Sequence, residues 1–350
     1  MDSPPTARLF PPVTRSLIGV ALIGFVLLLL HLATPILAPI LFSFFLVAIA
    51  ISPFRWLLAR GVRRGAALLI MIAVLLVGGV GLVLLTLISA RNLQAGLSMY
   101  GEQLGARTAE LSAALAQLGP GMSEADAQLT ALGVSGMGAF LSALVDFASS
   151  ALISLVIVTF FLFEVDRFMA IIQTERVRNV PFIGEVPEVA QTAVRYFGIR
   201  TRLNIITGIG VTLICLLVGV DYALLWGVAA FFLSYIPYIG LLTAMIPPAL
   251  LALAEYGWPQ ALLVVVAIVL INLTIENVVE PGYTGKRLKL SPTVVFLSFF
   301  FWGWLLGPVG ALLSMPITVM LLLVLQRDEE TLWLARVIGT QISGKAELES

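Results

Sequence analysis

Four polar residues near the end of one apolar stretch could bind a proton, a cation or a polar solute. They are Asn272, Glu276, Asn277 and Glu280. Asn272, Glu276 and Glu280 are four residues apart, so an α-helix would place them on one face. A charge at the bilayer centre costs at least ~2.5–3.5 kcal/mol, which makes this face a candidate functional site. The alternative is that both glutamates lie at the cytoplasmic helix end and pair with Lys286, Arg287 or Lys289.

A second candidate is an interruption between two apolar stretches, which reads Tyr235-Ile236-Pro237-Tyr238-Ile239-Gly240. Proline and glycine interrupt helices, and the free backbone groups of broken helices build solute sites in many transporters. Such interruptions also occur as plain kinks or turns between spans. Asn204, beside Arg202 near the start of another apolar stretch, is a weaker candidate for the same pathway.

The last apolar region, residues 293–326, is too long for one span and carries small residues in its middle. Small residues let two helices approach closely, so we expect a helical hairpin. Tryptophans also lie in its middle, which either a re-entrant hairpin lining a pathway or anchoring at the outer membrane interface would explain. The residues concerned are Trp302, Gly303, Trp304, Gly307, Pro308 and Gly310.

The sequence argues against several other chemistries. The phosphate-binding loop of ATP-driven pumps and the nucleophile elbow of serine hydrolases are both absent. The single histidine, His31, and the single cysteine, Cys215, cannot form a metal cluster, and we interpret both as packing or interfacial residues. The net charge is +0, which gives no indication of nucleic-acid binding. We therefore expect no enzyme activity, no cofactor, no metal and no nucleic-acid partner.

The elements that position these residues are membrane-spanning helices. Hydrophobic residues make up 60% of the chain and charged residues 11%, against about 25% charged in soluble proteins. A helix needs about 20 apolar residues to cross a bilayer, and continuous apolar runs favour helices over a barrel. We expect an all-α polytopic membrane protein of about eight spans plus the C-terminal re-entrant hairpin. The predicted spans are 17–34, 36–53, 66–90, 147–165, 203–220, 222–240, 241–257 and 259–279, and a tight turn at Thr34 and Pro35 would join the first two.

The basic residues predict how the chain is oriented. If the spans alternate from a cytoplasmic N-terminus, eighteen of the 20 Lys and Arg residues fall on the cytoplasmic side. Only Arg91 and Arg107 fall outside. This asymmetry follows the positive-inside rule. It predicts a multi-pass protein of a bacterial inner membrane with both termini in the cytoplasm.

Between the third and fourth spans we expect a polar, helical, extracytoplasmic insert, residues 91–146. Its leucines recur every seven residues, which places them along one seam of a helix. The seam would pack either on the protein's own spans or against another protomer. The leucines are Leu97, Leu104, Leu111 and Leu118.

Five regions therefore make up the expected chain organisation. Residues 1–90 hold a leader and three spans, and 91–146 the insert. Residues 147–202 hold the fourth span and a basic amphipathic segment. Residues 203–326 form the transport core, and 327–350 a cytoplasmic tail.

The C-terminal patterns together resemble the autoinducer-2 exporter family of bacterial membrane proteins, also called the PerM-like permeases. The resemblance covers about residues 15–330 and is specific in the C-terminal half. It rests on three runs in order, which are Tyr235 to Gly240, Glu276 to Pro281 with Gly285 and Ser291-Pro292, and Phe301 to Gly310 with Pro316.

The resemblance implies a transporter that works without ATP in a lipid bilayer, as a homo-oligomer. It makes Pro237, Gly240, Glu276, Pro281, Gly285 and Pro292 motif positions. Family members are linked to export of autoinducer-2 and others to sodium(lithium)/proton antiport, so the resemblance does not fix the substrate.

Three functions follow. The first is a secondary transporter or facilitated exporter of a small polar solute, with the pathway formed near Pro237 and Glu276. The second is a cation/proton antiporter in which Glu276 or Glu280 exchanges a proton for a monovalent cation. The third and least favoured is a membrane scaffold that transports nothing and binds partners through the leucine seam.

Overall fold

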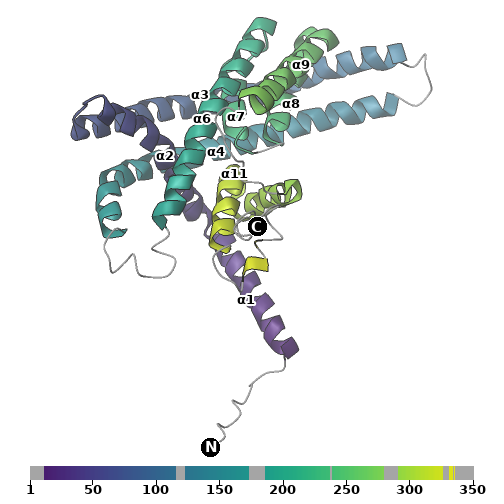
Figure 1. Cartoon of the computed structure of the whole chain (residues 1–350). Helices are drawn as coiled ribbons and strands as arrows, with labels where there is room; N and C mark the ends of the chain where they lie inside the picture. Colours follow the sequence, from purple (N-terminus) through teal and green to yellow (C-terminus); the bar gives the residue numbers. More distant parts are fainter. Residues whose placement is uncertain are drawn as a thin grey trace, which may run out of the picture.

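The protein is built from helices, and the computed structural model describes residues 12–115, 123–172, 186–236, 239–279, 291–325, 331–333 and 335. No β-strand occurs in these residues. Figure 1 shows the helices crossing one another at several angles. They are α1 (Pro12–Leu32), α2 (Thr34–Ala59), α3 (Arg64–Leu115), α4 (Ser123–Ile172), α6 (Val186–Val218), α7 (Ala223–Leu233), α8 (Gly240–Tyr256), α9 (Trp258–Thr274), the π-helix η3 (Ile275–Val279) and α11 (Pro292–Leu325).

The predicted all-α polytopic membrane fold is confirmed. Six helical segments are long and apolar enough to cross a membrane, and they lie in α2, α3, α4, α6, α9 with η3, and α11. Three predicted spans coincide with shorter apolar helices, Leu17–Leu32, Ala223–Leu233 and Gly240–Tyr256. The 11 residues of α7 cover about 16 Å, half of the ~30 Å hydrocarbon core, because turns end it on both sides. The total of eight spans stays a prediction.

α3 and α4 form one long antiparallel hairpin, seen as the two blue helices in Figure 1. Neither helix breaks where we expected a span to meet the insert, at Arg91 and at Asp146. The hydroxyls of Thr108 and Thr130 join the two helices at 3.0 Å. The segment 91–146 therefore continues the two spans instead of folding as a separate unit in the residues described.

The leucine seam packs within the chain where its side chains are described. Leu104 is 5% exposed and belongs to a core that includes Leu141 of α4 and Leu251 of α8, and Leu97 packs against the same core. Packing on the protein's own helices, one of the two alternatives, accounts for these leucines. The Leu111 side chain and Leu118 lie outside the described residues.

The expected tight turn between the first two spans is wrong. Only Ala33 separates α1 from α2, and its backbone stays in the right-handed helical region (φ −82°, ψ −1°). The Ala33 N–H donates to Leu29 O, and the Leu37 N–H donates to Ala33 O, so helical bonding runs through the junction. Pro35 sits in the first turn of α2, where a missing N–H costs nothing. The chain bends here without reversing.

α6 and α7 meet at two glycines. A Cβ atom on Gly208 would lie 2.8 Å from the carbonyl oxygen of Gly227, and one on Gly227 would overlap the Thr212 side chain. Glycine at both positions is therefore needed for this close approach. The contact fixes α7 against the middle of α6.

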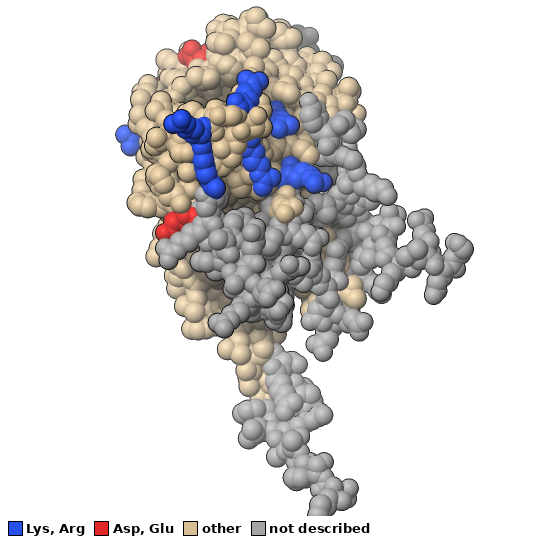
Figure 2. Space-filling view, turned by 60° about the vertical axis from the view of Figure 1, so that its left-hand side comes forward, with Lys and Arg blue, Asp and Glu red and all other residues tan. Residues whose placement is uncertain are grey.

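Arginine side chains gather at one end of the molecule. Figure 2 shows Lys and Arg side chains gathered on one face of the molecule. Four arginines near the turn between α2 and α3 are exposed, namely Arg55, Arg60, Arg63 and Arg64. They belong to the segment that the positive-inside rule assigns to the cytoplasm.

Hydrogen bonds at the α6–α7 turn tie that turn to α3. The Tyr100 hydroxyl donates to a carboxylate oxygen of Asp221 at 2.7 Å, and the Trp226 indole N–H donates to the Asp221 carbonyl at 2.9 Å.

We expect Tyr100→Phe to lower the free energy of unfolding by about 1–2 kcal/mol, because it removes a hydrogen bond to a charged acceptor. Thermal unfolding in detergent measures the loss. Asp221→Ala provides the control background. If Tyr100→Phe costs as much with Asp221→Ala as without it, the bond contributes nothing.

Candidate functional site

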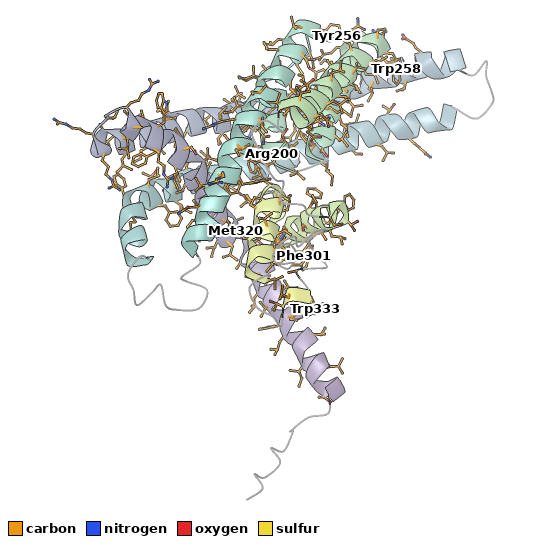
Figure 3. All side chains as sticks on the ribbon, in the orientation of Figure 1. Arg200, Tyr256, Trp258, Phe301, Met320 and Trp333 are labelled. Carbon is orange, nitrogen blue, oxygen red and sulfur yellow. The ribbon has the colours of Figure 1, made fainter. Side chains whose placement is uncertain are left out.

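Polar side chains gather on one side of α6, near the ends of α7 and α9, and we call them the α6 polar cluster. The cluster consists of Arg200, Thr201, Asn204 and Tyr235. Figure 3 places Arg200 midway along α6, below Tyr256 and Trp258 and above α11. Arg200, Thr201 and Asn204 lie in a helix that is otherwise apolar enough to span a membrane, and Tyr235 follows the end of α7.

Tyr235 is anchored by one polar contact and a shell of aromatic rings. Its hydroxyl lies 2.6 Å from the Thr201 hydroxyl, which is also 2.6 Å from the Phe197 carbonyl oxygen. Its ring packs edge-on to Phe45 and Phe231 with centroids 5.0 and 5.7 Å apart, and the residue is 1% exposed. The start of the interrupted segment is therefore held rigidly against α2 and α6.

Asn204 is buried without a complete set of hydrogen-bond partners. It is 2% exposed, and its side-chain nitrogen donates to no group in the part of the chain that the structure describes. An unpaired buried amide destabilises the fold by about 1–3 kcal/mol, so its presence needs a reason. A polar ligand that accepts a hydrogen bond from this nitrogen would be the missing partner.

The π-helix η3 begins one residue before Glu276. Its hydrogen bonds run from residue i to i+5, and such short π segments are frequent at functional sites. Glu276 is partly buried, whereas Asn277 is exposed and donates from its amide nitrogen to the Leu273 carbonyl at 3.0 Å. The widened turn changes the helical repeat, so the expected single α-helical face through Asn272 and Glu276 is interrupted.

Asn204 and η3 lie at the same level of the fold. α6 and α9 run antiparallel, since Tyr256 donates to the Gly219 carbonyl and a Cβ on Gly210 would touch Ile271. Asn204 lies six residues before Gly210 on α6, and the residue six positions after Ile271 belongs to η3. α6 and η3 are also in contact. The structure thus brings two independently predicted candidates, Asn204 and the Glu276 region, to one level.

The predicted C-terminal hairpin has the expected turn. Gly307 adopts φ 64° and ψ −153°, a conformation that essentially only glycine takes up. Two hydrogen bonds cross between the halves, from the Trp302 indole to the Thr318 hydroxyl at 3.0 Å and from there to Ser298 at 2.9 Å. The halves are about 22 and 27 Å long, shorter than the ~30 Å hydrocarbon core. That the hairpin is re-entrant stays a prediction.

The tip of this hairpin is fastened to the junction of α1 and α2. The Thr34 hydroxyl donates to the Leu305 carbonyl at 2.7 Å. His31 stacks on Trp304 with ring centroids 5.2 Å apart. His31 is therefore a packing residue, and the bend at Ala33 is what brings both side chains to the hairpin.

Some predicted site residues lie outside the described part of the chain, namely Pro237, Glu280, Pro281 and Gly285. Gly240 is described and buried, and a Cβ there would overlap the Leu233 carbonyl, so it permits the return from α7 into α8. Sequence reasoning missed Thr201 and Thr318. Threonine is common inside membrane helices, where it usually bonds to its own backbone, so no sequence signal marks these two.

Together these features define a class, a polytopic helical membrane protein with broken helices and a polar cluster between them. A sequence model described as "AI-2E family transporter" matches residues 18–327. The chain therefore belongs to the AI-2E family, whose members are transporters and not enzymes. The predicted family is confirmed.

Bacterial relatives agree with this assignment. "Putative transport protein YhhT" of Escherichia coli (strain K12) is 32% identical over 306 residues, which cover 83% of this chain and 84% of the relative. A Haemophilus influenzae protein named "Putative transport protein" is 30% identical over 334 residues, 93% of this chain and 96% of the relative. "AI-2 transport protein TqsA" of Escherichia coli (strain K12) is 40% identical over 179 residues, 51% of this chain and 52% of the relative.

Two hairpin glycines give a matched pair of substitutions. A Cβ on Gly310 would overlap the Trp302 carbonyl oxygen, whereas one on Gly303 would make ordinary contact with Ala311 at 3.5 Å. We expect Gly310→Ala to lower the free energy of unfolding by about 2 kcal/mol or more and Gly303→Ala to leave it nearly unchanged. Thermal unfolding and transport by the purified variants measure both. Equal effects of the two substitutions would contradict the hairpin packing.

Proposed function

We propose that this transporter moves a small polar solute of the autoinducer-2 class out of the cell, with the α6 polar cluster and η3 forming part of its pathway. One observation carries the proposal: the buried Asn204 amide lacks a hydrogen-bond partner among the described residues and lies level with Glu276. The name of the TqsA relative supplies the substrate class.

Broken helices around this level support the same pathway. α7 ends at Leu233, α8 begins at Gly240, and α9 passes into η3 at Ile275. In transporters, interrupted helices commonly make backbone groups available to bind solutes inside an apolar environment. A polar solute at this level could therefore contact both side chains and backbone.

Proteoliposome flux of autoinducer-2 tests the proposal. We expect Glu276→Gln and Asn204→Leu each to reduce flux by roughly 10-fold or more, because each removes one hydrogen bond between the solute and a charged or buried group. Asn204→Leu should also leave the protein as stable as before or more stable, because it removes an unpaired buried amide. Loss of flux with retained stability separates a pathway residue from a structural one.

Thr207→Val is the matched control, because Thr207 is equally buried on α6 but already donates to the Leu203 carbonyl. It should leave flux unchanged. A pH-sensitive dye and sodium pulses in the same vesicles test the antiporter alternative, which the names of the relatives do not support. Sodium-driven proton movement that disappears in Glu276→Gln, without solute flux, would replace the proposal. Full flux in Asn204→Leu would remove Asn204 from the pathway.

We further propose that the protein lies in the inner membrane with both termini in the cytoplasm and assembles as a homo-oligomer. The exposed arginines between α2 and α3 support the cytoplasmic assignment of that turn. A protease added to right-side-out vesicles should spare tags at both ends, and inverted vesicles should lose both. Cleavage of the N-terminal tag alone in right-side-out vesicles would show that α1 and α2 do not cross the membrane separately. The native mass in detergent reports the number of protomers.

A further inference from the structure

α6 borders a large apolar cavity, which it lines with Ile205, Gly208, Ile209, Thr212 and Leu213. The cavity has a volume of about 600 Å³ and lies between α2, α3, α4, α6 and α7. This is within the ~300–1,000 Å³ range of ligand-binding pockets. Neither Asn204 nor any residue of η3 lines it.

The chemistry of the lining excludes a polar occupant. Thr86 and Thr212 supply the only side-chain polar groups among the described lining residues. Both hydroxyls donate to carbonyls of their own helix, those of Leu82 and Gly208, at 2.9 Å. With no donor left to pair with a solute, the cavity suits a hydrocarbon chain.

The open edge of the cavity faces the bilayer. α3 and α6 form this edge, and both contain a membrane-spanning segment. Their lining side chains are strongly exposed, with Val74 of α3 at 58%, and Ile209 and Leu213 of α6 at 56% and 52%. In a membrane these side chains contact lipid. The occupant can therefore enter sideways from the bilayer.

Two arginines continue the cavity-lining stripe of α6. Arg195, Arg202 and Ile209 are seven residues apart and so follow nearly one line along the helix. Arg195 and Arg202 are both exposed, and neither forms a hydrogen bond or ion pair with another described residue. Arg202 and Leu213 are about 16 Å apart along the axis, close to the ~15 Å thickness of one leaflet's hydrocarbon.

We propose that an anionic phospholipid binds here, with its phosphate at Arg195 and Arg202 and one acyl chain in the apolar cavity. Guanidinium groups recognise phosphate by paired charge-assisted hydrogen bonds. The stripe thus matches a lipid in charge at one end and in apolar character along its length. A helix of a second copy would satisfy the cavity but leave the two arginines without an anion.

Native mass spectrometry of the full-length protein in micelles with either phosphatidylglycerol or phosphatidylcholine tests the proposal. We expect wild type to retain phosphatidylglycerol in roughly 10- to 30-fold preference, from two arginines near the membrane surface. The double variant Arg195→Gln/Arg202→Gln should lose this preference, and Arg91→Gln should keep it. Equal retention of the two lipids by wild type would overturn the headgroup assignment.

Substitution of a cavity glycine tests the acyl-chain site separately. Gly78 lines the cavity and a Cβ there meets nothing within 4 Å, so Gly78→Phe should fill the space and abolish retention of both lipids. Gly81→Phe is the control, since Gly81 is equally open on the same helix but does not line the cavity. Gly78→Leu replaces Gly78→Phe if the larger variant does not fold. Unchanged lipid retention, or a fall in oligomeric mass without a change in bound lipid, would overturn the proposal.

Discussion

The close backbone contact between α6 and α7 at Gly208 and Gly227 determines how the centre of this transporter is organised. In a bilayer the hydrophobic effect does not drive helices together, so close packing at small residues and internal hydrogen bonds must hold them. This contact fixes the short helix α7 against α6, while the Thr201–Tyr235 and Tyr100–Asp221 hydrogen bonds hold the segments on either side of α7. A helix of only 11 residues could not cross the membrane alone, and it is stable here because α6 and α3 support both of its ends.

With α7 in place, α6 presents two adjacent sides of different chemistry. Asn204 lies on one side, toward the broken helices, and the adjacent side lines a cavity without free polar groups. Polar groups inside a membrane are costly and are retained where they bind something, so the first side suits a solute. The second side, continuous with the lipid-facing surface, suits a hydrocarbon chain. One helix thus separates the proposed solute pathway from the proposed lipid site.

The sequence predicted well what depends on composition and on glycine or proline. The all-α membrane fold follows from hydropathy, and the hairpin turn at Gly307 follows from a glycine in the middle of an over-long apolar run. It predicted poorly what depends on tertiary contacts. The junction at Ala33 was expected to reverse the chain. Pro35 suits the first turn of a helix whether the chain reverses before that helix or only bends, so it could not distinguish the two. Nothing local distinguishes η3 from an α-helix, and the partner of Tyr235, Thr201, is 34 residues away.

The central claim, that Asn204, which is 2% exposed in this structure, becomes accessible to water and solute during transport, can be tested with a single engineered cysteine. The one native cysteine, Cys215, lies on the same helix and is completely buried, so the wild-type chain serves as its own unreactive control. In a Cys215→Ala background, Asn204→Cys should react with a membrane-impermeant thiol reagent, and autoinducer-2 should slow that reaction. An Asn204→Cys thiol that is as unreactive as Cys215, with or without the solute, would contradict the account.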